Sequence, residues 1–230
     1  MKRKLERFAE MATFDHVVQP KIEEVLNKDY KLKGNWNAKF FNNNNPIVIE
    51  LGCGKGEYTV GLAQKFKNKN FIGIDIKGSR MWRGAKTVLE EGINNTGFLR
   101  TRIEFINSFF NKNEITDIWL TFPDPQLKKP RKRLTSPHYL NIYNKFLKSN
   151  GAIQLKTDNE VLYKYTLDLA LYNQLTIIDK TDNLYNAKGM EEAKLFKTFY
   201  ELKYLSKGIK IKYLKFKLNN KIIVDLPDEE

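Results

Sequence analysis

A run of branched apolar residues that ends in closely spaced glycines is the feature that most restricts the fold. The run Ile47–Leu51 leads into Gly52, Gly54 and Gly56, and helical patterning follows over residues 58–66. A short continuous apolar run suits a strand that is buried on both faces of a parallel sheet. Glycines between such a strand and a helix permit a tight turn and a close approach of the backbone to a ligand. The pattern therefore predicts an α/β sheet with a ligand-binding loop.

The rest of the chain repeats this alternation. Strand patterns follow at residues 71–76, 97–100, 117–122, 152–156, 174–179 and 210–218, and helix patterns at 78–92, 136–147 and 159–172. Alternation of this kind predicts a parallel sheet with helices on both faces. The segments after residue 184, including 210–218 and 221–224, look antiparallel or irregular. We expect a Rossmann-like, mostly parallel seven-stranded sheet with a C-terminal antiparallel strand. Its domain would span residues 46–224, between an N-terminal arm (1–45) and an acidic tail (225–230).

Two carboxylates narrow the class of ligand. The third glycine comes one residue too early for the dinucleotide fingerprint G-x-G-x-x-G, because position 57 is Glu. Glu50 stands two residues before the first glycine, where it would repel a pyrophosphate but would suit a ligand with a cationic amino group and a sulfonium. Asp75 ends the second strand, where an acid commonly hydrogen-bonds ribose hydroxyls, although it could also cap the next helix. Together these features predict that S-adenosylmethionine binds at the loop.

The charge balance points to a polyanionic partner. The net charge is +13, from 40 Lys and Arg against 27 Asp and Glu. Such an excess favours nucleic acid, although a Lys-rich and Asn-rich composition can also reflect an AT-rich genome. The one cysteine, Cys53, is interpreted as a packing residue, and it allows no disulfide within the chain, which suits a reducing, cytoplasmic compartment. We expect no metal site and no membrane span. The composition does not decide between a monomer and a homodimer.

A turn rich in proline follows the strand at 117–122. Pro123, Asp124 and Pro125 form this turn, and five cations in the six residues 128–133 come next. Ligands of an open parallel sheet bind beyond the carboxyl ends of its strands, so this turn is expected at the reacting centre. The prolines would fix where Asp124 points. The position of the basic run favours contact with phosphates over a merely solvated charge run.

This arrangement suits methyl transfer to a base nitrogen. The N7 lone pair of guanine carries no proton, so its attack on a methyl group needs no general base. The product ring is cationic, and a fixed carboxylate in a water-poor site would stabilise that charge. Holding the two reactants in line supplies most of the remaining acceleration. Asp124 is therefore the candidate catalytic residue.

Taken together, the motifs resemble those of the bacterial tRNA (guanine-N7)-methyltransferases. The matching stretches lie between about residues 34 and 205: GNWN at 34–37, NPIVIE at 45–50 with the glycine loop, FIGID at 71–75, FPDP at 122–125 with its basic run, LKTD at 155–158 and TFYE at 198–201. The resemblance implies a class I methyltransferase fold. It also implies that S-adenosylmethionine donates a methyl group to N7 of a guanosine in the variable loop of tRNA.

The resemblance also assigns residues to roles. It implies that the methyl donor is met by Glu50, Gly52, Gly54, Gly56, Asp75, Arg102 and Asp124. It implies that the substrate guanosine is met by Lys128, Asp158, Thr198, Phe199, Tyr200 and Glu201. Contact with RNA is implied for Pro130, Arg131, Lys132, Arg133, Leu134 and Thr135.

The chain departs from the family pattern at two places. Gln126 follows the P-D-P turn, where the family usually has Trp, and this would remove an aromatic surface near the target base. The family carries an acid near the adenine after its third strand, and a gapless alignment puts Arg102 there. Either the backbone makes the adenine contact, or the alignment shifts toward Glu104.

Three other hypotheses stay open. The protein could be a methyltransferase for another base or for a protein, and identifying the methylated product separates that case. It could be a non-catalytic RNA-binding protein with a residual donor site, which measuring S-adenosylmethionine binding tests. A dinucleotide oxidoreductase is disfavoured by the displaced glycine and by Glu50.

Overall fold

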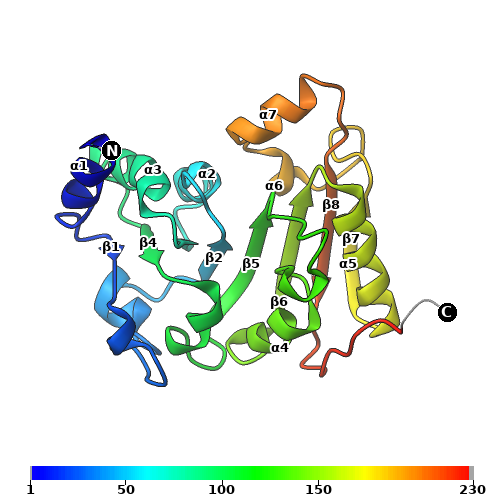
Figure 1. Cartoon of the computed structure of the whole chain (residues 1–230), viewed down its shortest axis with the longest axis horizontal. Helices are drawn as coiled ribbons and strands as arrows, with labels where there is room; N and C mark the ends of the chain where they lie inside the picture. Colours follow the sequence, from blue (N-terminus) through cyan, green and yellow to red (C-terminus); the bar gives the residue numbers. More distant parts are fainter. Residues whose placement is uncertain (1, 228–230) are drawn as a thin grey trace. The chain divides into compact units, whose positions relative to one another are not determined.

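The computed structural model describes residues 2–227, and the chain divides after Ile115 into two compact units (Figure 1). Unit 1 comprises the residues up to Ile115, and unit 2 begins at Thr116. Each unit combines strands with flanking helices. Among the described residues, no helix is long and apolar enough to span a membrane.

Unit 1 contains four parallel strands in the order β1, β4, β3, β2. The register pairs Leu51 of β2 with Ile74 of β3, and Asp75 with Arg100 of β4. The carboxyl ends of these strands therefore lie at one edge, where the glycine loop begins. The elements of unit 1 are α1 (Lys2–Met11), β1 (Val17–Val18), η1 (Ile22–Glu24), η2 (Asn37–Phe41), β2 (Ile47–Leu51), α2 (Glu57–Lys65), β3 (Asn70–Asp75), α3 (Gly78–Glu90), β4 (Thr96–Arg100) and η3 (Ile103–Ser108).

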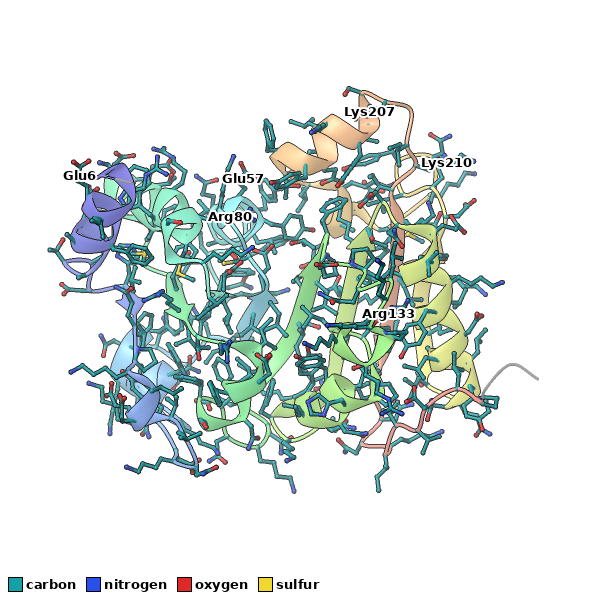
Figure 2. The ribbon with its side chains drawn as sticks, in the orientation of Figure 1. Glu6, Glu57, Arg80, Arg133, Lys207 and Lys210 are labelled. Atoms are coloured by element: carbon teal, nitrogen blue, oxygen red, sulfur yellow. The ribbon has the colours of Figure 1, made fainter. Side chains whose placement is uncertain are left out.

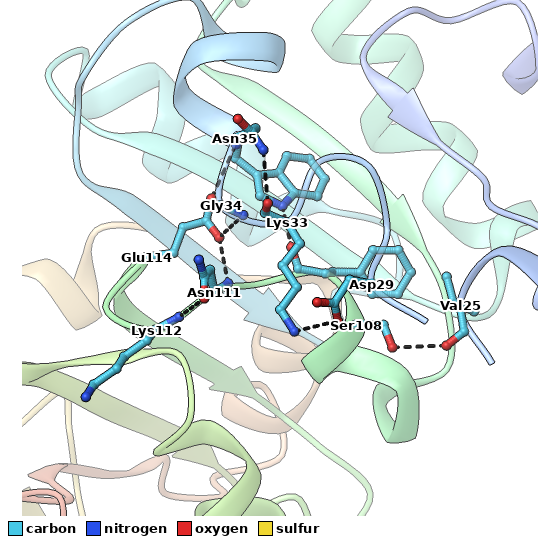
Figure 3. Close-up of polar contacts among 11 residues, drawn as sticks. Val25, Asp29, Lys33, Gly34, Asn35, Ser108, Asn111, Lys112 and Glu114 are labelled. Carbon is cyan, nitrogen blue, oxygen red and sulfur yellow. Dashed lines mark hydrogen bonds and ion pairs between the residues drawn. The ribbon is translucent and has the colours of Figure 1, made fainter. Parts of the chain in front are cut away.

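The segment before β2 is bonded to the rest of unit 1 at several points, and the Glu114 carboxylate makes three of these bonds (Figure 3). Glu114 accepts hydrogen bonds from the backbone N–H groups of Gly34 at 2.9 Å, Trp36 at 3.3 Å and Asn111 at 2.8 Å. The Trp36 ring is fully buried, and its Nε1 donates to the carbonyl of Phe109 at 2.8 Å. The G-N-W-N stretch is therefore a structural anchor in unit 1.

Helix α1 packs on α3. Glu10 accepts hydrogen bonds from the Trp82 indole N–H at 2.7 Å and from Lys86 at 2.9 Å. The Arg7 guanidinium lies 4.5 Å from the centre of the Trp82 ring. Residues 1–45 were expected to form an arm, and their described part contributes a packed helix and the edge strand β1 to unit 1.

Unit 2 contains four strands in the order β5, β6, β8, β7. Strand β8 runs antiparallel to both β6 and β7, and it pairs Tyr213 with Lys156 of β6. The elements are β5 (Ile115–Thr121), η4 (Pro130–Lys132), α4 (Pro137–Tyr143), β6 (Leu147–Thr157), α5 (Glu160–Tyr172), β7 (Thr176–Thr181), α6 (Glu191–Lys194), α7 (Phe199–Leu205) and β8 (Lys212–Lys217).

The structure confirms the mostly parallel α/β fold with a C-terminal antiparallel strand, but the predicted number of strands was wrong. The described residues hold eight strands. The additional strand is β1, which was not predicted because two residues are too few to produce an alternation pattern. The segment 221–224 is not a strand. Its backbone is hydrogen-bonded to side-chain amides instead. The amide of Asn141 bonds to the backbone of Ile223, and the amide of Asn173 bonds to that of Val224. Of the predicted acidic tail, residues 228–230 lie outside the described part of the chain.

Candidate active site

The three glycines of the loop in unit 1 serve two different purposes. All three have positive φ, at +77° for Gly52, +57° for Gly54 and +73° for Gly56. A Cβ added at Gly52 or Gly54 would meet no atom within 4 Å, whereas one at Gly56 would lie 2.6 Å from the Phe98 ring. Gly56 therefore allows close packing, as the third glycine of such loops does. Gly52 and Gly54 present bare backbone to open space, where a ligand can approach.

Glu50 lies buried beneath this loop, with 4% of its surface exposed. Its Oε2 accepts hydrogen bonds from the backbone N–H of Thr59, at 2.9 Å, and from the Thr59 hydroxyl. Thr59 is in the first turn of α2, where the helix dipole favours negative charge. Burial raises the pKa of the neighbouring Cys53 thiol well above its usual value, and the charges of Glu50 and Asp75 raise it further. Glu50 thus holds a carboxylate in a fixed orientation beside the glycines.

Asp75 links the glycine loop to the turn after β3. Its Oδ2 accepts from the N–H of Gly54 at 3.0 Å, and its Oδ1 accepts from the N–H of Lys77 at 2.7 Å. The residue at the N-cap position of α3 is Lys77, so Asp75 does not occupy the cap itself. An ionised carboxylate has about four lone-pair sites. The two backbone bonds therefore orient Asp75 and leave it able to accept from a ribose diol.

Arg102 and Glu104 both lie just beyond β4 and are exposed. Arg102 immediately precedes η3, and Glu104 is in the first turn of that helix. Their role toward the adenine stays a prediction. In the part of the chain that is described, no group of three or more His, Cys, Asp and Glu residues is arranged to hold a metal ion.

In unit 2, the turn after β5 has an unusual backbone. Phe122 and Gln126 have positive φ, at +49° and +47°. Such values are rare for bulky residues and concentrate at functional sites. The exposed Asp124 accepts a hydrogen bond from the N–H of Gln126 at 3.0 Å, and the Phe122 N–H donates to the carbonyl of Lys156 at 2.7 Å. The turn therefore presents Asp124 to solvent in a fixed conformation.

The basic loop after this turn divides into exposed and buried residues. Lys128, Pro130, Arg131 and Lys132 are exposed, and Leu134 is half-buried. Arg133, labelled in Figure 2, is only 5% exposed. Its Nε donates to the carbonyl of Pro125 at 3.0 Å, and its guanidinium lies 4.3 Å from the centre of the Tyr165 ring. Thr135 is fully buried, with its hydroxyl bonded to that of Thr166. The side chains of Arg133 and Thr135 therefore hold the loop in place, and their predicted contact with RNA stays a prediction.

Asp158 follows directly after β6 and is half-buried. Burial raises the pKa of its carboxyl group, and the nearby Lys212 ammonium acts in the opposite direction. Lys212 also forms an ion pair with Glu160 at 3.0 Å. A carboxylate that has lost part of its hydration is well suited to accept hydrogen bonds from a ligand.

The stretch from Thr198 to Glu201 begins α7. Thr198 and Glu201 form a capping box, and Phe199 and Tyr200 are 54% and 45% exposed. Glu201, however, is fully buried and forms an ion pair with Lys156 at 2.8 Å. The structure therefore places Glu201 in the interior of unit 2, and the contact with the substrate that the resemblance implies for it stays a prediction.

Two residues that the sequence analysis did not single out complete this buried group. The Lys156 ammonium donates to the carbonyls of Ala193 at 2.6 Å and Phe196 at 3.1 Å. The Tyr185 hydroxyl donates to Glu201 at 2.5 Å, and burial together with this bond strongly raises the pKa of Tyr185. The sequence does contain a signal for Lys156, which is a lysine within the apolar pattern of β6. Because buried charges are usually paired, such a lysine predicts a buried acidic partner.

Comparisons with known proteins show the family to which the chain belongs. Residues 44–214 match the family described as "Putative methyltransferase". The tRNA (guanine-N(7)-)-methyltransferase of Bacteroides thetaiotaomicron is 48% identical over 229 residues, covering 100% of this chain and 91% of that protein. The protein of the same name from Christiangramia forsetii is 49% identical over 220 residues, covering 94% and 98%.

Solved structures show the fold alone, because their sequence identity is low. The 16S rRNA methyltransferase KamB has a TM-score of 0.61 at 14% identity, covering 78% of this chain and 91% of that one. The 16S rRNA (adenine(1408)-N(1))-methyltransferase from Catenulisporales acidiphilia has a TM-score of 0.58 at 12% identity, covering 86% and 97%. Both have the Rossmann-like methyltransferase fold. Because the family model matches residues 44–214 and these relatives align along nearly the whole chain, this chain belongs to the tRNA (guanine-N7)-methyltransferase family.

Proposed function

We propose that the protein transfers a methyl group from S-adenosylmethionine to N7 of a guanosine in tRNA, in the variable loop. The observation that carries the proposal is the glycine loop of unit 1, whose bare backbone at Gly52 and Gly54 lies beside two oriented carboxylates. The names of relatives that align along nearly the full length support the choice of acceptor.

The residues of unit 1 fit the methyl donor. Asp75 would accept hydrogen bonds from the ribose hydroxyls, because its carboxylate is already oriented by Gly54 and Lys77. Glu50 supplies negative charge beneath the loop for a ligand that carries an amino group and a sulfonium. The open backbone at Gly52 would admit the ligand without a side chain in the way. When bound, the donor supplies an electrophilic methyl group.

The residues of unit 2 fit the acceptor. Guanine presents N–H donors on its base edge, and the half-buried Asp158 is a suitable acceptor for them. The exposed Lys128, Arg131 and Lys132 would contact the phosphates of the RNA. Asp124 would stabilise the positive charge that develops on the ring, and no proton has to be removed before attack.

The test is to incubate the protein with labelled donor and tRNA, and then to identify the methylated nucleoside and its position. We expect 7-methylguanosine in the variable loop. A label found only in protein, or at another atom of the RNA, would contradict the proposal.

The variant Asp124→Asn is expected to bind S-adenosylmethionine like the wild type in calorimetry but to lose about 10²-fold or more in turnover, the usual cost of removing an electrostatic stabiliser. Asn preserves the size of the side chain and can still accept the bond from Gln126, so the variant tests charge. Unchanged turnover would remove Asp124 from the mechanism.

A further inference from the structure

Thr59 of α2 makes two hydrogen bonds to the buried carboxylate of Glu50, and both reach the same atom. The backbone N–H of Thr59 donates to Oε2 at 2.9 Å, and the Thr59 hydroxyl donates to Oε2 as well. Hydrogen bonds to an ionised group are about twice as strong as those between neutral groups. Thr59 is only 2% exposed, so little water competes for this oxygen. The Thr59 side chain therefore helps to set the direction of the carboxylate.

The backbone bond and the hydroxyl bond serve different purposes. Thr59 is the third residue of α2, and the first four N–H groups of a helix have no partner within the helix. The N-cap position is occupied by Gly56, which has no side chain to cap the helix, and Glu50 accepts the Thr59 N–H in its place. The helix needs no bond from the hydroxyl. The second bond therefore acts on Glu50 and not on the helix.

Strand β3 leaves room for this hydroxyl by placing a glycine opposite Glu50. The register of the sheet pairs Glu50 of β2 with Gly73 of β3. A Cβ added at Gly73 would lie 3.0 Å from the Thr59 hydroxyl oxygen and 2.8 Å from the Phe98 ring, closer than ordinary contacts. A side chain at position 73 would therefore displace Thr59 or Phe98. The absence of a side chain at Gly73 allows the hydroxyl to stay beside Glu50.

We infer that Thr59 is a positioning residue for the methyl donor and acts through Glu50. Its hydroxyl keeps the carboxylate turned in one direction beside Gly52 and Gly54, so the negative charge is in place before the donor binds. A group that is already ordered loses less freedom on binding than a mobile one, and this favours affinity. The inference rests on the proposed function, because it takes the ligand of the glycine loop to be S-adenosylmethionine.

Two substitutions of Thr59 test the hydroxyl. Thr59→Val replaces the hydroxyl with a methyl group of similar size and keeps the backbone bond, whereas Thr59→Ser keeps the hydroxyl. Affinity for S-adenosylmethionine would be measured by calorimetry, with the full chain and without tRNA. Thr59→Val should weaken donor binding about 5- to 20-fold, which is part of the worth of a hydrogen bond to a charged group. Thr59→Ser should restore binding to within about 2-fold of the wild type. Wild-type affinity in Thr59→Val would overturn the inference.

A double-mutant cycle with Glu50→Gln shows whether Thr59 acts through this carboxylate. Glu50→Gln removes the charge and should weaken donor binding by itself. Adding Thr59→Val to this variant should then cost less than about 2-fold, because the charge that the hydroxyl orients is already gone. Losses that simply add would show that Thr59→Val loosens the loop in general, and this result would also overturn the inference.

The matched control is Thr96→Val in β4. Thr96 is also a buried threonine of unit 1, but within the described part of the chain its hydroxyl has no hydrogen-bond partner. Its donor affinity should equal that of the wild type, and a loss as large as that of Thr59→Val would contradict the role of Thr59. If Thr59→Val melts below the temperature of the assay, the comparison of Thr59→Ala with Thr59→Ser takes its place.

These measurements separate the inference from the proposed function. A protein that binds the donor as expected but methylates another acceptor would contradict the proposed function and leave the role of Thr59 in place. Equal donor binding by the wild type and Thr59→Val would overturn the role of Thr59 and leave the proposed function in place. A wild-type protein that binds no S-adenosylmethionine would overturn both.

Discussion

Replacing Lys156 with Met should destabilise unit 2 strongly. The side chain of Met is unbranched and apolar and fills a similar space, but it removes the ammonium that pairs with Glu201 in an interior where both side chains are 0% exposed. It also leaves the carbonyls of Ala193 and Phe196 without the hydrogen bonds that Lys156 donates to them. Breaking one side of a buried ion pair costs about 3–5 kcal/mol. At about 2–4 °C per kcal/mol for a chain of this size, the melting temperature should fall by roughly 6–20 °C.

Two further variants make this prediction specific. The double variant K156M/E201Q removes both charges, and Gln can still serve in the capping box with Thr198. It should recover most of the lost stability, because replacing a whole buried pair is often nearly neutral. The matched control is Lys33→Met. Lys33 lies 2.7 Å from Asp29, but that carboxylate is 72% exposed, so the loss should stay within about 1 kcal/mol.

The measurement is urea unfolding followed by circular dichroism, with amide hydrogen exchange across α7. In K156M, exchange at residues 199–205 should accelerate more than exchange in the strands of unit 1. A loss below about 1 kcal/mol, or a double variant as unstable as the single one, would refute the role given to the buried pair.

Three other predictions concern unit 1. Burial holds the pKa of His16 below its ordinary value, so the unfolded chain binds the proton more readily. Stability should fall as the pH drops below about 6.5, and His16→Gln should reduce this dependence in urea titrations from pH 7.5 to 5.5. Cys53 should resist iodoacetamide in the folded protein and react once it is unfolded, because it is buried with a raised pKa; rapid labelling of the folded protein would contradict this. Gly52→Ala should cost about 1–2 kcal/mol in stability because of its positive φ, and it should chiefly weaken donor binding in calorimetry. Gly56→Ala should lower the melting temperature further, because the added Cβ would also collide with the Phe98 ring. Equal melting temperatures for the two variants would refute this distinction.

Local patterns predicted the parts of the fold that depend on neighbouring residues. Ile47–Leu51 is apolar in an unbroken run, and every residue of the resulting strand β2 is buried. The glycines and Asp75 could be placed at the carboxyl ends of strands because parallel strands end at one edge. The two-residue strand β1 left no such pattern, since it depends on pairing with β4, about 80 residues further along the chain.

The candidate site was less predictable where partners are distant in sequence. Arg133 looks like part of a basic run, but its burial depends on Tyr165 and on the Pro125 carbonyl. Glu201 matched a substrate-binding stretch, and its pairing with Lys156 across 45 positions became visible only in the structure. The charge of a residue can be read from the sequence, whereas its exposure depends on the folded neighbours.

The hydrogen bonds that Glu114 accepts from Gly34 and Trp36 affect the order in which the protein folds during synthesis. The backbone N–H groups of Gly34 and Trp36 can bond to Glu114 only after about 80 more residues have been synthesised, and β1 can pair only after β4 has been synthesised. Non-local contacts of this kind cannot form before the intervening chain exists, and closing such long loops slows folding. The N-terminal segment must therefore leave the ribosome without its native partners. Unit 1 can be completed only when about half of the 230 residues have been made.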